Sequence, residues 1–351
     1  MSLISFAEFM HFALYDVKKG YYTQKNTPFG KQGDFVTAPL LSHLFGHTLA
    51  LQMIDVFKHL SEPEIFEFGA GTGKLCIDVL TKLEAEEKLP RAYHILEVSG
   101  HLQTLQQEAI HEAIPHLAHL VIWHQTLPEK PIEGVVIANE VLDAMPVHRF
   151  VSTDEGLYEG MVEQQEGNYQ ETLKPCDNQA LATYVSTYVE HSKRPYSSEA
   201  NLMVEPWLKS CHDILAKGIV LLIDYGFPAH EYYHPDRNMG TLMCHHQHKA
   251  HPNPFIHVGE QDITAHVNFT HVADSALKAG FQVSGYTSQA AFLLALGLLN
   301  LVDKSSLEDK QAAKVLLQPH EMGELFKVIA LGKAFDEPLL GFMLQDKRAH
   351  L

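Results

Sequence analysis

Three glycines at alternating positions, Gly69, Gly71 and Gly73, have the clearest chemical meaning in this 351-residue chain. An apolar stretch at 63–68 precedes them and an amphipathic stretch at 73–88 follows. The pattern predicts a buried strand, a tight turn and a helix. Glycine lacks a Cβ and tolerates positive φ, so a ligand can approach the backbone of such a turn closely. We therefore expect a ligand site at this turn.

The spacing of the glycines narrows the class of ligand. Dinucleotide-binding loops have the pattern G-x-G-x-x-G, whereas this turn is G-x-G-x-G. A phosphate-binding P-loop needs glycine where Phe68 stands, and Ser or Thr where Leu75 stands. What remains is the type of loop that binds S-adenosylmethionine (SAM), in which an acidic residue, here Glu67, precedes the first glycine. The alternative is a strand-to-helix turn that binds nothing.

A carboxylate at the end of the next predicted strand supports a SAM site. This strand covers residues 92–97 and ends in Glu97, about 24 residues after Gly73. A carboxylate placed there in a βαβ unit can accept hydrogen bonds from both ribose hydroxyls of a nucleoside. An ordinary exposed charge is the alternative. The two signals at this spacing favour the site.

The predicted elements indicate an α/β fold with a Rossmann-like sheet of seven strands, the last two of which give an antiparallel edge. We expect residues 1–60 to form a helical cap. The α/β core is predicted to comprise 61–148 and 217–351, with a helical insertion at about 288–318. Residues 149–216 are predicted to form an inserted subdomain with a hairpin and helices. Ligands of such sheets bind at the carboxyl ends of the strands.

A second polar group follows the predicted strand 134–138. Asn139, Glu140 and Asp143 stand close together in the sequence. If a helical turn forms there, Glu140 and Asp143 share a face because they are three positions apart. Two carboxylates can hold a guanidinium through paired hydrogen bonds. The alternative is that Asn139 and Asp143 only cap the following turn while Glu140 is solvated.

The charge of the chain limits its partners. The formal net charge is −17 and the isoelectric point is about 5.7. A nucleic acid is not expected as a partner, because its phosphates are repelled by an acidic surface. The same field favours a basic protein or peptide. Acidity that serves only solubility is the alternative.

Composition also bears on compartment, membrane and metal. The longest apolar stretch, 290–302, is too short to span a bilayer but offers a face for a homodimer. Four scattered cysteines form no C-x-x-C pair, and no basic leader precedes an apolar run. These observations predict a cytoplasmic protein that does not bind to membranes. The histidine-rich stretch 244–257 lacks zinc-type spacing, so no metal is expected.

Several short blocks of residues appear along the chain in one order. They are Ala13-Leu14-Tyr15, Gly20-Tyr21-Tyr22, Gly33 to Thr37, Glu67 to Gly73, Asn139-Glu140, Asp143-Ala144, Ile223 to Gly226 and Gly259 to Val267. In these blocks the chain resembles the MidA family of SAM-dependent methyltransferases over nearly its whole length. The resemblance implies a class I methyltransferase core with an N-terminal cap. The family's mitochondrial member methylates arginine in a subunit of respiratory complex I, which implies a protein substrate here.

The resemblance also implies roles for individual residues. The cap over the cofactor would include Gly33, Asp34 and Thr37, while Glu67, Gly69, Gly71, Gly73 and Glu97 would lie beneath it. Gln125 stands near the position of the acid that contacts adenine in many methyltransferases. Asn139, Glu140 and Asp143 would face the methyl acceptor, and a carboxylate among them would take the guanidinium proton. A small-molecule methyltransferase and a non-enzymatic assembly factor are the alternatives.

Overall fold

The computed structural model describes residues 3–23, 37–165, 168–189, 195–247 and 249–351. The predicted cap residues Gly33 and Asp34 lie outside the described residues. The chain forms two compact units. Unit 1 comprises Met1–Phe35, Leu142–Pro206 and Gly226–Val272, and unit 2 comprises Val36–Val141, Trp207–Tyr225 and Ala273–Leu351.

These units differ from the boundaries that the sequence predicts. Residues 36–60 group with the α/β core instead of with a cap, because Leu49, Met53 and Val56 pack in the same apolar cluster as the sheet. Residues 226–272, expected in the core, group with the N-terminal residues. There, Ile263 and Ala265 pack against the first helix of the chain.

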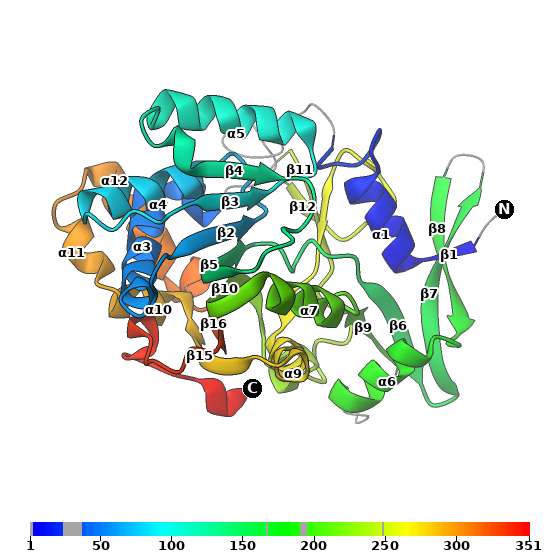
Figure 1. Cartoon of the computed structure of the whole chain (residues 1–351). Helices are drawn as coiled ribbons and strands as arrows, with labels where there is room; N and C mark the ends of the chain where they lie inside the picture. The colour runs from blue at the N-terminus through cyan, green and yellow to red at the C-terminus, as the bar shows by residue number, and fades with distance from the viewer. Residues whose placement is uncertain (1–2, 24–36, 166–167, 190–194, 248) are drawn as a thin grey trace. The chain divides into compact units, whose positions relative to one another are not determined.

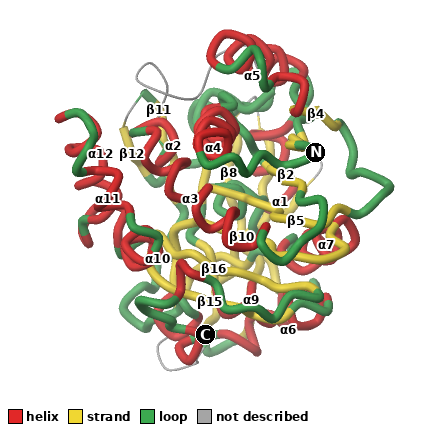
Figure 2. The backbone as a smooth tube through the Cα atoms, turned by 60° about the vertical axis from the view of Figure 1, so that its left-hand side comes forward, coloured by secondary structure: helices red, strands yellow, loops and turns green. Residues whose placement is uncertain are grey.

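The sheet that organises unit 2 has seven strands along its main path, in the order β15-β16-β10-β5-β2-β3-β4 (Figure 1), and the short strand β14 (Val267–Asn268) pairs with β10 outside this path. The neighbours from β10 to β4 are parallel, whereas β16 is antiparallel to both β10 and β15. Figure 2 shows β10, β16 and β15 side by side. The predicted Rossmann-like sheet with an antiparallel edge is confirmed. The strands are β2 (Glu64–Phe68), β3 (Tyr93–Leu96), β4 (Val121–His124), β5 (Ile132–Asn139), β10 (Leu215–Phe227), β15 (Gln282–Ser288) and β16 (Phe326–Lys333).

The alternation of side chains along β2 explains how helices cover this sheet. Ile65 lies in an apolar cluster with residues of several helices, among them Leu49 of α3, Val79 of α4 and Ile110 of α5. Phe68 points to the other face, where its ring is 5.1 Å from that of Trp207. The helices of this part of the chain are α2 (Ala38–Leu41), α3 (His43–Phe57), α4 (Lys74–Ala85), α5 (Gly100–Ala113), α7 (Val204–Ile214), α9 (Phe269–Ala279), α10 (Gln289–Ala295), α11 (Leu298–Val302) and α12 (Leu307–Leu317).

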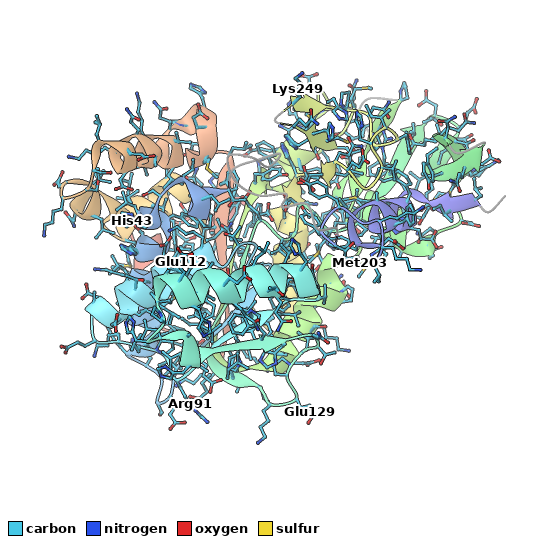
Figure 3. The ribbon with its side chains drawn as sticks, turned by 90° about the horizontal axis from the view of Figure 1, so that it is seen from above. His43, Arg91, Glu112, Glu129, Met203 and Lys249 are labelled. Atoms are coloured by element: carbon cyan, nitrogen blue, oxygen red, sulfur yellow. The ribbon has the colours of Figure 1, made fainter. Side chains whose placement is uncertain are left out.

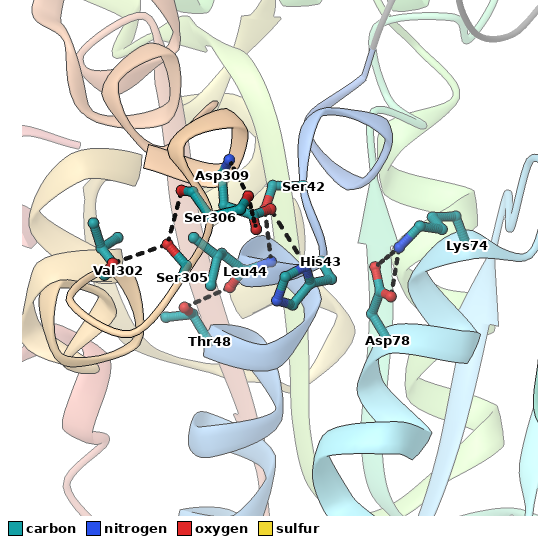
Figure 4. A network of polar contacts seen from close by, with 10 residues as sticks. All are labelled: Ser42, His43, Leu44, Thr48, Lys74, Asp78, Val302, Ser305, Ser306 and Asp309. Atoms are coloured by element: carbon teal, nitrogen blue, oxygen red, sulfur yellow. Dashed lines mark hydrogen bonds and ion pairs between the residues drawn. The ribbon is translucent and has the colours of Figure 1, made fainter. Parts of the chain in front are cut away.

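The start of α3 is held by the helical insertion. Ser42 Oγ donates to Asp309 Oδ1 at 2.7 Å, and Ser306 Oγ donates to Asp309 Oδ2 at 2.7 Å (Figure 4). Ser306 caps α12 by accepting from Asp309 N at 3.1 Å, and the side chain of Asp309 also binds the residue before α3. On the neighbouring helix α4, Lys74 pairs with Asp78 (Figure 4). These contacts fix the segment that follows Thr37.

Register places the ends of three strands at one edge of the sheet. Phe68 of β2 is opposite Leu96 of β3 and Ala138 of β5. The glycine turn, Glu97 and Asn139 follow these positions, so they gather at the carboxyl edge. At the opposite edge, Arg91 (labelled in Figure 3) pairs with Glu62 at 2.8 Å.

Unit 1 is built on two smaller sheets. One has the order β1-β7-β6-β9 with β8 beside β7, and the other has the order β12-β11-β13. The first residues of α1 form a capping box between Ser5 and Glu8. The elements are β1 (Leu3–Ser5), α1 (Phe6–Tyr15), β6 (His148–Thr153), β7 (Gly156–Gln165), β8 (Asn168–Pro175), α6 (Gln179–Tyr188), β9 (Tyr196–Ala200), α8 (Ala229–Tyr232), β11 (Met243–His246), β12 (Lys249–His251), β13 (Asp262–Thr264) and β14 (Val267–Asn268).

Candidate functional site

The glycine turn has the backbone conformation that its sequence predicts. Gly69, Gly71 and Gly73 have φ of 67°, 53° and 80°. Other residues rarely adopt this left-handed region. A Cβ on Gly69 would also lie 2.9 Å from Val141 Cγ2. Gly73 is the N-cap of α4 and brings no side chain to that helix end, while its own N–H donates to Ala70 O at 2.8 Å.

Glu97 lies beside this turn in a pre-formed hydrogen-bond network. Its side chain is buried, its Oε1 accepts from Ser99 N at 2.8 Å, and its Oε2 accepts from Gln106 Nε2 at 3.0 Å. Burial raises the pKa of this carboxyl, while the hydrogen bonds from Ser99, Gln106 and the backbone of Val98 oppose the rise. A carboxylate offers about four acceptor positions. The backbone of Val98 also donates a hydrogen bond to this carboxylate. Contact of Glu97 with the ribose hydroxyls of SAM stays a prediction.

Glu67 lies beneath the turn, inside the core. It is 2% exposed, and its Oε2 accepts from Tyr93 Oη at 2.7 Å. Burial raises its pKa to about 7, and the charge of Glu97 adds to the rise. The contact that the structure describes for the side chain of Glu67 is therefore with Tyr93 of β3, inside the core. Direct contact of Glu67 with the cofactor stays a prediction.

Replacing Glu67 by glutamine is expected to reduce the pH dependence of stability. The folded protein holds this proton up to about pH 7, while the ordinary pKa is 4.5. The free energy of unfolding of the wild type should thus fall as pH rises from 5 to 8, by about 1–3 kcal/mol. Glutamine still accepts from Tyr93 but does not ionise. Urea unfolding at pH 5.5 and 8.5 measures this, and an equal pH difference in both proteins would contradict it.

The end of β4 and the residue after it form the third part of the candidate site. Trp123 Nε1 donates to Gln106 Oε1 at 3.0 Å, and His124 O accepts from Glu97 N at 2.9 Å. Gln125 follows at an exposed position. Its contact with adenine stays a prediction.

The turn after β5 carries the polar groups predicted to face the acceptor. Asn139 Nδ2 donates to Glu140 Oε1 at 3.2 Å, while Asn139 Oδ1 is buried without a hydrogen-bond partner. Glu140 N donates to Ile223 O at 2.9 Å. Glu140 has φ of 52°, which is rare outside glycine and is often found at functional sites. Ala38 N, next to Thr37, lies 3.4 Å from Glu140 Oε1.

The helical turn predicted for residues 140–143 does not form. None of these four residues, all of which the structure describes, is helical. The positive φ of Glu140 is incompatible with a right-handed helix. The argument that Glu140 and Asp143 share a helix face is therefore wrong.

Asp143 belongs to a buried cluster in unit 1. It is 5% exposed, and its backbone oxygen accepts from Ala265 N at 3.0 Å. Tyr22 Oη donates to Asp262 Oδ1 at 2.8 Å. Burial, together with Asp262 and Asp143, raises the pKa of Tyr15. The site residues predicted from the sequence include neither Tyr15 nor Asp262. Both stand in the family blocks.

Neither a metal cluster nor a membrane helix is found in the part of the chain that the structure describes. No group of three or more His, Cys, Asp or Glu side chains is arranged to hold a metal. In the histidine-rich stretch, His246 stacks on His257 at 4.2 Å and its Nδ1 lies 2.8 Å from Glu260 O. No described helix is long and apolar enough to cross a bilayer.

Unit 2 thus offers SAM a turn of left-handed glycines, a buried carboxylate with free acceptor positions and an unpartnered amide oxygen. A family model for S-adenosyl-L-methionine-dependent methyltransferases matches residues 48–287, which is more than half of the chain. The chain belongs to this methyltransferase family. SAM is therefore the cofactor of this enzyme, as the glycine spacing and Glu97 predict.

Relatives of this methyltransferase agree with that assignment. A protein of Burkholderia thailandensis that was crystallised bound to S-adenosyl-homocysteine is 38% identical, with a TM-score of 0.95 over 99% of this chain and 92% of that chain. The mitochondrial protein arginine methyltransferase NDUFAF7 of Homo sapiens is 27% identical over 93% of this chain and 80% of that protein. Its Drosophila melanogaster homolog is 27% identical, covering 93% and 81%.

The predicted cytoplasmic localisation is contradicted by these relatives. The curated relatives named above are mitochondrial proteins. The prediction rested on the lack of a recognisable leader in the sequence. The lack of a leader does not identify the compartment of a protein.

Proposed function

We propose that this methyltransferase transfers methyl groups to an arginine guanidinium of a partner protein. The observation that carries the proposal is the Asn139–Glu140 turn, which presents an unpartnered amide oxygen and a carboxylate at the carboxyl edge that also carries Glu97. The curated relatives are named protein arginine methyltransferases, which supports the same acceptor. The net charge of −17 supports a basic protein partner and disfavours a nucleic acid.

The residues of this chain would divide the work as follows. When bound, SAM supplies an electrophilic methyl group. Glu97 and the glycine turn bind and orient the cofactor, so much of the acceleration comes from positioning. Asn139 Oδ1 accepts from one guanidinium N–H, and the Glu140 carboxylate accepts from another. A guanidinium has a pKa above 12 and must lose a proton around transfer. Glu140 is the proposed proton acceptor.

Fewer observations support the roles of Asp143 and Thr37 and the formation of a homodimer. Asp143 as a second carboxylate facing the acceptor, and Thr37 in the cap over the cofactor, stay predictions. A homodimer through 290–302 also stays a prediction. Leu299 is 54% exposed there, whereas Phe292, Leu293 and Leu298 are buried. The apolar face available to a second copy is therefore small.

The acceptor is tested by methyl transfer from tritiated SAM. The protein is incubated with host lysate, which is then separated into protein and small-molecule fractions. We expect label in protein, released as methylarginine after acid hydrolysis. Lysate passed through a filter that retains proteins is the matched control and should take up no label. Label in the filtered lysate would identify a small-molecule acceptor, and label in methyllysine would overturn the choice of arginine.

A further inference from the structure

One buried side chain contacts all three parts of the cofactor site. Gln106 lies in α5 and is 0% exposed. Its Nε2 donates to Gly71 O and to Glu97 Oε2, both at 3.0 Å. Its Oε1 accepts from Trp123 Nε1 at 3.0 Å. A single amide thus connects the glycine turn, the ribose carboxylate and strand β4.

The chemistry of the three partners requires an amide at this position. The carbonyl of Gly71 and the carboxylate of Glu97 only accept, while the indole N–H of Trp123 only donates. A primary amide supplies two N–H donors and one acceptor oxygen on a planar group, and all three are used. A carboxyl group would turn one oxygen toward Glu97. An aliphatic side chain would leave all three partners without this bond.

We propose that Gln106 is a positioning residue that holds Glu97 and the glycine turn in the arrangement that binds SAM. Without it, the side chain of Glu97 loses its hydrogen bond at Oε2 and keeps those from the backbone of Ser99 and Val98. The carboxylate can then rotate away from the ribose hydroxyls. The carbonyl of Gly71 loses its hydrogen bond from α5 in the same substitution.

The packing of the turn against α5 supports this role. A Cβ built on Gly73 would lie 3.5 Å from the Cα, Cβ and Cγ atoms of Gln106. The helix thus backs the turn directly, and the amide of Gln106 lies at that contact. Rigid placement of binding groups raises affinity because less freedom is lost when the ligand binds. Gln106 need not touch SAM to have this effect.

The test compares substitutions at Gln106 with one at its neighbour. Affinity for SAM is measured by titration calorimetry at pH 6 and pH 8.5 for the wild type, Gln106→Leu, Gln106→Glu and Gln107→Leu. Gln107 is exposed on the same helix and is the matched control. The wild type at each pH accounts for titration of Glu97 and Glu67. We expect Gln106→Leu to bind SAM about 10-fold or more weakly at both pH values, and Gln107→Leu to bind like the wild type.

The affinity of Gln106→Glu for SAM distinguishes a positioning role from a role that only fills space. If Gln106 only filled space, this affinity would not change with pH relative to the wild type. At pH 8.5 the new carboxylate faces Glu97 Oε2 and Gly71 O, so binding should be weaker than in Gln106→Leu. At pH 6 the group is protonated and donates one hydrogen bond, because its pKa is raised by burial and by Glu97. Affinity for SAM should therefore recover several-fold on acidification, relative to the wild type at the same pH.

Two results would overturn the proposal. One is a folded Gln106→Leu protein with a Kd for SAM within twofold of the wild type. The other applies if that variant does not fold, as judged by circular dichroism. Trp123→Phe then removes the indole N–H that donates to Gln106 Oε1, together with the five-membered ring, and should weaken binding about threefold. Wild-type affinity in both Trp123→Phe and Gln106→Glu would exclude a positioning role.

Discussion

Glu97→Ala is expected to lower the affinity for SAM by about 100-fold or more, while the protein stays folded. The carboxylate is held by Ser99 N and Gln106 Nε2, so its remaining acceptor positions are oriented before SAM binds. Loss of two charge-assisted hydrogen bonds to ribose hydroxyls removes about 3–5 kcal/mol of binding free energy. The variant also leaves Gln106 Nε2 with one buried acceptor fewer.

Titration calorimetry with SAM and with S-adenosyl-homocysteine measures this loss. Both ligands carry the same ribose, so both should weaken by a similar factor. Glu97→Gln is the graded control, because it keeps one acceptor oxygen and should lose about 10-fold. Glu108→Ala, at an exposed position of α5, should bind both ligands normally. A Kd for SAM within threefold of the wild type in folded Glu97→Ala would remove Glu97 from the ribose site.

The cofactor half of the site could be predicted from sequence because its signals are local. Positive φ at Gly69, Gly71 and Gly73 requires glycine, and this requirement is visible in the residue types. Glu97 follows from the length of one βαβ unit, since Phe68 and Leu96 end their strands at the same level of the sheet. The positions of the strands along the chain follow from their apolar patterns.

Gln106 shows what such local signals miss. It occupies the core-facing position between Leu102 and Ile110 in α5. A glutamine at this spacing among apolar residues is a signal of a buried polar role. Its partners cannot be predicted, because Gly71 and Trp123 come from segments that only the folded sheet brings together.

The helical turn predicted for residues 140–143 does not form, because backbone geometry overrides spacing. Three-residue spacing between carboxylates suggests a helix, but the φ of Glu140 is positive. A long-range contact also decides the conformation of the residues before α9. Residues 262–264 pair with β11, and the helix begins only at Phe269. In both cases a long-range contact, to Ile223 O or to β11, decides the local conformation.

Glu140→Gln is expected to lower kcat for methyl transfer by about 100-fold to 10,000-fold, while the affinity for SAM stays unchanged. Glutamine keeps the size of the side chain and an oxygen that accepts from Asn139 Nδ2. It tolerates the positive φ no worse than glutamate does. It cannot take a proton from the acceptor, so the loss should fall on turnover.

The measurement pairs labelled methyl transfer to protein with calorimetric binding of SAM. Glu133→Gln is the matched control, because Glu133 is an exposed glutamate of β5, the strand that ends directly before Glu140. It should leave both quantities unchanged. Raising the pH should not restore turnover in Glu140→Gln below the pKa of the guanidinium, since no other base is proposed at this turn. Normal turnover with normal SAM affinity would show that Glu140 takes no part in the chemistry, and the proton acceptor would then have to be sought elsewhere, beginning with Asp143.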